Sequence, residues 1–129
     1  MNFDQAALTN YLSNQADIEL AFLFGSRAKN TARQDSDIDL AIRCKTPLST
    51  ERKITLTEQL AKQFGLAVDL IDIHNAGEPL LGQIIQGTML IGQNNQKADL
   101  IYRHLINQAD FLPLRDRILK ERRELWINK

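Results

Sequence analysis

Three aspartates lie in two separate segments whose apolar patterns are typical of strands. Asp37 and Asp39 are two positions apart in the segment SDIDLAIR, and Asp69 lies in the later segment LAVDLIDI. Side chains at alternate positions of a strand point to one face, so Asp37 and Asp39 face the same side. Carboxylates that share a face repel one another unless something positive lies between them. The pattern therefore predicts a bound cation.

The ligand type favours Mg²⁺ as that cation. Two positions along a strand span about 7 Å, so the carboxyl groups of Asp37 and Asp39 can converge on one point. Asp69 adds a third carboxylate if its strand is a neighbour. Mg²⁺ takes one or two carboxylates and completes its shell with water and substrate phosphates. Two such ions about 4 Å apart form the clamp used in phosphoryl or nucleotidyl displacement.

A Gly-Ser pair ends the apolar run IELAFLF shortly before the acidic segment. Gly25 permits backbone conformations closed to other residues and lets a phosphate approach the main chain, while Ser26 offers a hydroxyl and an amide. We expect this pair to hold the terminal phosphates of a nucleotide. Arg27 is a candidate for a further nucleotide contact, and Lys29 is the second nearby cation; both are equally compatible with ordinary solvated charges.

Two other motifs for cations and phosphates do not fit. An EF-hand starting at Asp35 needs Gly at its sixth position and Glu at its twelfth, where the chain has Leu40 and Thr46. The chain also lacks the G-x-x-x-x-G-K-[ST] pattern of a P-loop. Asp35 is expected in a turn. Asp72 differs from Asp69 by an odd number of positions, so we expect it off the acidic face, at a strand end or on the surface.

The elements that position these residues alternate between helix and strand, which favours an α/β arrangement with helices packed on a small sheet. Whether the pairing is parallel or mixed stays open at this point. Ser49 or Thr50 is a suitable N-cap and Gly65 a suitable C-cap for the second helix. The expected strands cover residues 18–24, 36–43, 66–73 and 88–92, and the expected helices lie within 3–14, 48–65, 78–86, 96–111 and 114–127, the last two separated by Pro113.

Composition bounds the class of protein. A length of 129 residues with 43% hydrophobic residues predicts one domain with a single packed core. Sixteen basic residues balance sixteen acidic ones, so we expect no direct binding of nucleic acid and no membrane association. The single cysteine cannot form an internal disulfide, and the first residues lack the pattern of a signal peptide. A cytoplasmic location is expected.

These motifs carry a resemblance to a known family. The residues GS, ten further residues and then DID reproduce the G-S-x10-D-x-D signature of the DNA polymerase beta-like nucleotidyltransferases, and VDLID resembles the site of their third acidic residue. The lead-in FLFGSRA and the short length resemble the minimal nucleotidyltransferases, the MntA-like antitoxins encoded beside HEPN-domain (HepT-like) toxins. The resemblance runs from about Ile18 to Ile73. It implies a mixed sheet of about four strands flanked by helices, in one domain over 1–129 with a C-terminal helical extension from about residue 94.

The resemblance also implies roles for five residues. Gly25 and Ser26 would hold nucleotide phosphates, Asp37 and Asp39 would ligate both of two Mg²⁺ ions, and Asp69 would ligate the ion that activates the acceptor hydroxyl. The implied activity is a protein adenylyltransferase that acts as an antitoxin and transfers AMP from ATP to a tyrosine of a HEPN-type toxin. Two alternatives are a nucleotidyltransferase acting on a small molecule such as an aminoglycoside, for which the chain has little room for an acceptor domain, and an antitoxin that neutralises by contact alone.

Overall fold

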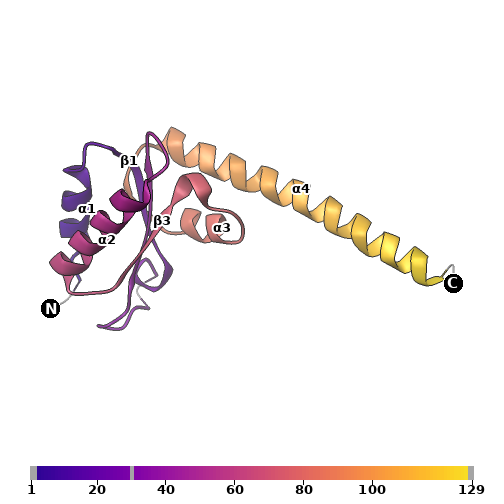
Figure 1. Cartoon of the computed structure of the whole chain (residues 1–129), viewed down its shortest axis with the longest axis horizontal. Helices are drawn as coiled ribbons and strands as arrows, with labels where there is room; N and C mark the ends of the chain where they lie inside the picture. The colour runs from indigo at the N-terminus through magenta and orange to yellow at the C-terminus, as the bar shows by residue number, and fades with distance from the viewer. Residues whose placement is uncertain (1–2, 30, 128–129) are drawn as a thin grey trace.

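The protein forms a four-stranded sheet with helices on both faces (Figure 1). The computed structural model describes residues 3–29 and 31–127, with side chains outside 110–116 and 124–127. The strands are β1 (Ile18–Phe24), β2 (Ile38–Cys44), β3 (Val68–Asp72) and β4 (Thr88–Ile91), and the helices are α1 (Gln5–Ser13), α2 (Thr50–Phe64), α3 (Leu80–Ile85) and α4 (Asn94–Ile127).

The sheet is mixed, with the strand order β3-β2-β1-β4. β1 is antiparallel to both of its neighbours, β2 and β4, whereas β2 and β3 are parallel. The implied mixed sheet of about four strands is therefore confirmed. β1 is central and buries residues on both of its faces, which explains why its sequence is an almost continuous apolar run.

Each face of the sheet carries its own apolar cluster. α1 and α2 cover one face, and α3 with the start of α4 covers the other (Figure 1). The cluster under α1 and α2 includes Leu8, Leu12, Leu23, Ile38, Leu40, Ile42, Leu56, Leu60 and Leu70. The cluster under α3 and α4 includes Leu20, Phe22, Phe24, Ala41, Ile73, Leu81, Ile84 and Leu100. The alternation in β2 thus divides its residues between two cores, and Asp39 shares a face with the second.

The helix ends agree with the expected capping residues. The Ser49 side chain accepts a hydrogen bond from the Arg52 amide at 3.1 Å, so Ser49 and not Thr50 is the N-cap of α2. Gly65 ends α2 in the left-handed conformation, with φ at 64°. Both assignments confirm the boundaries predicted for this helix, because each residue satisfies backbone groups that the helix itself leaves unpaired.

α4 corrects the prediction of two C-terminal helices. A single helix runs from Asn94 to Ile127 and continues through Pro113. Proline removes one backbone hydrogen bond and crowds the preceding turn, which bends a helix but ends it only where its flanks are poor helix formers. In α4, the helical residues on both sides of Pro113 stabilise the helix by more than this proline costs. α4 extends well away from the sheet (Figure 1). No helix within the described residues has the length and apolarity needed to cross a membrane.

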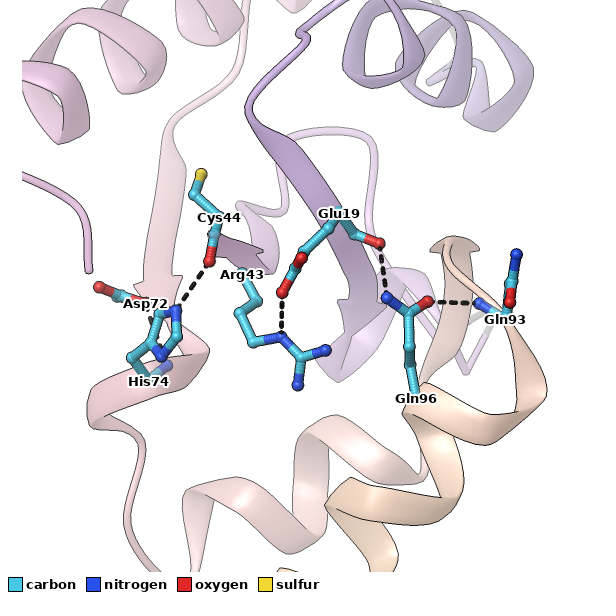
Figure 2. A network of polar contacts seen from close by, with 7 residues as sticks. All are labelled: Glu19, Arg43, Cys44, Asp72, His74, Gln93 and Gln96. Carbon is cyan, nitrogen blue, oxygen red and sulfur yellow. Dashed lines mark hydrogen bonds and ion pairs between the residues drawn. The ribbon is translucent and has the colours of Figure 1, made fainter. Parts of the chain in front are cut away.

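The first part of α4 is fastened to the body by polar contacts. The Gln96 side chain donates to the backbone carbonyl of Glu19 at 3.5 Å and accepts from the Gln93 amide at 2.7 Å (Figure 2). The Glu19 carboxylate pairs with Arg43 of β2 at 2.8 Å. These contacts join α4 to β1 and β2 at the end of the sheet away from Asp39.

A second set of contacts holds α4 against the segment that follows β3. The Arg103 guanidinium donates to the backbone carbonyls of Ile73 and Ala76. His104 meets the Glu78 carboxylate at 2.8 Å. The start of α4 is therefore held against β1 and against the segment that follows β3. The rest of the helix extends away from this attached part.

Candidate active site

The acidic residues meet where β1 ends and where β2 and β3 begin. Asp39 is the register partner of Phe24 on β1 and of Asp69 on β3. Because β2 and β3 are parallel, residues in register present their side chains on the same face. The sequence prediction that Asp69 joins the acidic face of the sheet is thus confirmed by the strand register.

Asp37 departs from the expected position. β2 begins at Ile38, so Asp37 lies in the segment just before the strand and is exposed. The predicted strand began two residues too early, because Ser36 and Asp37 have no strand partner and the ladder starts with the bond from the Ile38 amide to the Ala67 carbonyl. The position of Asp37 therefore depends on the preceding loop as well as on the sheet.

The three carboxylates interact with one another. Burial raises the pKa of Asp39 above its ordinary value, and the negative charges of Asp69 and then of Asp37 raise it further. Each of these effects disfavours the ionised form of Asp39. A cation beside these carboxylates would offset the repulsion and favour the ionised form of Asp39.

Gly25 is required by the shape of this site. Its φ is +72°, a conformation that other residues adopt only with strain. A Cβ atom at this position would also overlap the Oδ2 atom of Asp39. The absence of a side chain therefore allows the turn after β1 to lie directly against the carboxylate of Asp39.

A pocket of about 310 Å³ opens beside this turn. It is lined by Gly25, Ser26, Lys29, Thr31 and Gln83. The sequence predicts no more than an assisting role for Lys29, and Gln83 comes from α3, a segment that carries no motif. The helical spacing of Leu81 and Ile84, both buried, does place Gln83 on the opposite and exposed side of α3, but only the fold brings that side to the Gly-Ser turn.

Arg27 does not share that pocket. Its guanidinium donates hydrogen bonds to the backbone carbonyls of Ser36, Gln34 and Arg33, at 2.7 to 3.5 Å. In this structure the side chain is thus directed at the loop that precedes Asp37. The expected contact between Arg27 and a nucleotide remains an untested prediction.

Asp72 is part of the structural framework. Its two carboxylate oxygens accept hydrogen bonds from the Leu48 amide at 2.8 Å and from the His74 amide at 3.0 Å. The His74 ring in turn contacts the carbonyl of Cys44 at 2.7 Å (Figure 2). Asp72 ends β3 and lies off the acidic face, as predicted. The alternative prediction of a surface position is wrong, because Asp72 is buried.

The donor set is compatible with Mg²⁺. Among the side chains that the structure describes, no group of three or more His, Cys, Asp or Glu forms a cage that could hold a metal ion. Mg²⁺ does not need such a cage, because one or two carboxylates with water and substrate phosphates complete its shell. Asp39 and Asp69 are register partners, Asp37 lies near them and a pocket opens alongside, so their carboxylates can provide one or two ligands of this kind.

The fold and the site define a class of protein. Residues 6–97 match the family model described as polymerase beta, nucleotidyltransferase. This match covers the sheet, the acidic residues and the Gly-Ser turn, so the chain belongs to the polymerase beta nucleotidyltransferase family. Over 99 residues it is 31% identical to the protein adenylyltransferase MntA of Shewanella oneidensis, and the aligned region covers 71% of each chain.

Solved structures extend the similarity to almost the whole chain. A crystal structure of a toxin-antitoxin with AMP-PNP has a TM-score of 0.80 and 25% sequence identity, and covers 92% of this chain and 98% of that chain. A structure of tri-AMPylated Shewanella oneidensis HEPN toxin in complex with MNT antitoxin has a TM-score of 0.66 and 25% identity, and covers 90% of this chain and 99% of that one.

Proposed function

We propose that this protein is the antitoxin of a toxin–antitoxin pair and transfers AMP from ATP to a tyrosine of a HEPN-type toxin in a Mg²⁺-dependent reaction. The observation that carries the proposal is the pairing of Asp39 with Asp69, with Asp39 directly against Gly25, which also lines the pocket of about 310 Å³. The similarity to the adenylyltransferase MntA supports the reaction type. The structures with AMP-PNP and with an AMPylated HEPN toxin support the donor and the acceptor.

The binding roles follow from the positions of the side chains. Gly25 and Ser26 hold the phosphates of ATP, and Lys29 offsets part of their charge, because these residues line one pocket. Asp37, Asp39 and Asp69 would hold two Mg²⁺ ions, which when bound neutralise the charge that develops during transfer.

The transfer itself is a displacement at the α-phosphorus of ATP. The hydroxyl oxygen of the acceptor forms a bond to that phosphorus, and the bond from the phosphorus to the β-phosphate oxygen breaks, so pyrophosphate leaves. The hydroxyl proton passes to a carboxylate oxygen of Asp69, which is the exposed member of the register pair. Asp39 is the more buried member, and its carboxylate lies directly against Gly25.

A protein acceptor also agrees with the surface of α4. Large apolar side chains on this helix are exposed, among them Tyr102 at 67% and Leu105 at 58%. Apolar residues concentrated on an exposed surface are typical of sites that bind other proteins. Among the side chains of α4 that the structure describes, the exposed large apolar ones are Ile101, Tyr102, Leu105, Ile106, Ile118 and Leu119.

Thermal unfolding with ATP tests the nucleotide site. At 100 times its Kd, a ligand stabilises the native state by about 2.7 kcal/mol, so ATP should raise Tm by several degrees when Mg²⁺ or Mn²⁺ is present. The double substitution Asp37→Ala with Asp39→Ala should remove this effect. Asp35→Asn is the matched control, because Asp35 lies in the neighbouring turn and faces a different hollow beside Lys62. Equal protection by ATP in chelator would refute the metal-dependent site.

A further inference from the structure

Arg27 connects the Gly-Ser turn to the loop that leads into the acidic site. Its Nε and Nη2 atoms both donate to the carbonyl oxygen of Ser36, at 3.1 and 2.7 Å. Nη2 also lies 3.3 Å from the carbonyl oxygen of Gln34 and 3.5 Å from that of Arg33. The Arg27 guanidinium therefore donates hydrogen bonds to three backbone carbonyls of the segment 33–36.

The guanidinium of Arg27 also lies over an aromatic ring. The Cζ atom of Arg27 lies 4.9 Å from the centre of the Phe3 ring, within the range of a cation–π interaction. The Phe3 ring in turn packs against Phe64 at the end of α2, with 5.8 Å between ring centres. These contacts hold Arg27 in place and keep its charge directed at the loop, whereas Lys29 lines the pocket beside Ser26.

The clamped carbonyl belongs to the residue directly before Asp37. On the other side of Asp37, the Ile38 amide bonds to the Ala67 carbonyl at 2.9 Å and begins the ladder between β2 and β3. Asp37 has no strand partner, so these two attachments set the position of its backbone. Building on the proposed function, we propose that Arg27 is a positioning residue that places the Asp37 carboxylate for metal binding and does not bind the phosphates of ATP.

The geometry explains why this position needs arginine. Arginine presents several N–H donors in a rigid planar fork, so a single side chain can reach carbonyl groups on three residues at once. Lysine keeps the positive charge but offers a compact ammonium group on a flexible stem. Arg27→Lys therefore removes the fork and leaves the charge of the site unchanged.

The test compares Arg27→Lys with two other substitutions. Arg33→Lys is the matched control, because Arg33 lies in the same loop with an exposed side chain and contributes its backbone to the clamp. Lys29→Gln removes the cation that lines the pocket. Hydrogen exchange of the loop amides, Tm, Mn²⁺ affinity and the KM for ATP at saturating metal are measured for each variant and for the wild type.

Arg27→Lys should speed exchange at the Arg33 and Ser36 amides, whose partners lie within the loop. It should weaken Mn²⁺ binding by about 10-fold, as substitutions that support metal ligands commonly do. The KM for ATP at saturating metal should stay within about twofold of the wild type, whereas Lys29→Gln should raise it by about 10-fold, since a charge-assisted hydrogen bond is lost.

Three results would overturn this role. A raised KM for ATP with unchanged loop exchange would make Arg27 a phosphate ligand. A lower Tm with unchanged Mn²⁺ affinity would make its role purely structural, and equal effects of Arg33→Lys would show that the fork of Arg27 is not special. A wild-type protein that binds neither Mn²⁺ nor ATP would instead refute the proposed function, so the two failures are distinguishable.

Discussion

Asp39 and Asp69 lie opposite each other on the parallel strands β2 and β3, and the charge of Asp69 raises the pKa of Asp39 beyond the effect of burial. Like charges in adjacent positions of a sheet destabilise it. The protein therefore gives up folding stability at this point of the sheet. Such a local conflict is expected at a functional site, where a bound cation removes the repulsion.

Asp39→Asn should consequently stabilise the metal-free protein. Removing one charge of the repelling set should add up to about 1 kcal/mol to the free energy of unfolding, or a few degrees in Tm. Transfer activity should be lost in the same variant. Thermal unfolding in chelator, with Asp35→Asn as the control, measures the gain; a Tm below that of the wild type would show that the carboxylates do not repel one another.

The turn before the acidic site offers a comparison between two glycines. Gly25 and Gly65 have similar positive φ angles, 72° and 64°, but a Cβ on Gly65 would meet no described atom within 4 Å. Gly65→Ala should therefore cost about 1–2 kcal/mol from backbone strain alone and leave the activity unchanged. Gly25→Ala should add displacement of Asp39, and misplacement by about 1 Å can lower turnover about 100-fold. Equal activity of the two variants would contradict the close contact.

The two aspartates of β3 should separate function from stability. Asp69 is exposed on the acidic face, so Asp69→Asn should lower transfer by about 100-fold or more with little change in Tm. Asp72 accepts backbone hydrogen bonds with both oxygens. Asp72→Asn would turn an NH₂ group toward one of these amides and should cost about 1–3 kcal/mol. Activity assays and urea unfolding of both variants check this, and the reverse pattern would mean that the strand register is wrong.

The contact between Glu78 and α4 should depend on pH. Burial would raise the pKa of Glu78, but hydrogen bonds from His104 and Asn107 outweigh it and hold the pKa below its usual value. A lowered folded-state pKa stabilises the protein above the unfolded value, about 4.3, and this contribution is lost as the pH falls through the folded value.

Glu78→Gln should therefore cost about 1 kcal/mol near pH 7, and this cost should decline as the pH falls below the unfolded value of about 4.3 and through the lowered pKa of the folded protein. Glu121→Gln is the control, because Glu121 pairs with Arg117 at 3.9 Å on the exposed surface of α4 and should matter little across this pH range. A Glu78→Gln effect that shows no decline as the pH is lowered would assign the loss to packing.

Local patterns predicted most of the fold because the decisive residues are close together in sequence. The apolar run 18–24 followed by Gly25 defines β1, and Ser49 with Gly65 bounds α2. The direction of strand pairing was not predictable from single segments, since alternation specifies a face but no partner. The prediction of a break at Pro113 was wrong because proline removes one backbone hydrogen bond, which is a small loss in a helix as long as α4.

The acidic site was predictable for the same reason, whereas its surroundings were not. The spacing of residues within each strand predicts the face on which Asp39 and Asp69 lie. Only the pairing of β2 with β3 could not be predicted in this way. Arg27 contacts backbone carbonyls, and no side-chain pattern in the sequence marks a carbonyl as an acceptor. Gln83 reaches the pocket from α3 through the tertiary fold alone.

The intact mass of the partner toxin tests the central claim most directly. Incubation of the toxin with this protein, ATP and Mg²⁺ should raise the toxin mass by whole AMP units, with pyrophosphate released. The variant that combines Asp37→Ala and Asp39→Ala should fold, because the apolar face of β2 is untouched, and should leave the toxin mass unchanged. A toxin that is neutralised by the wild-type protein and by the double variant alike, with no change in mass, would show that neutralisation occurs by contact and not by transfer of AMP.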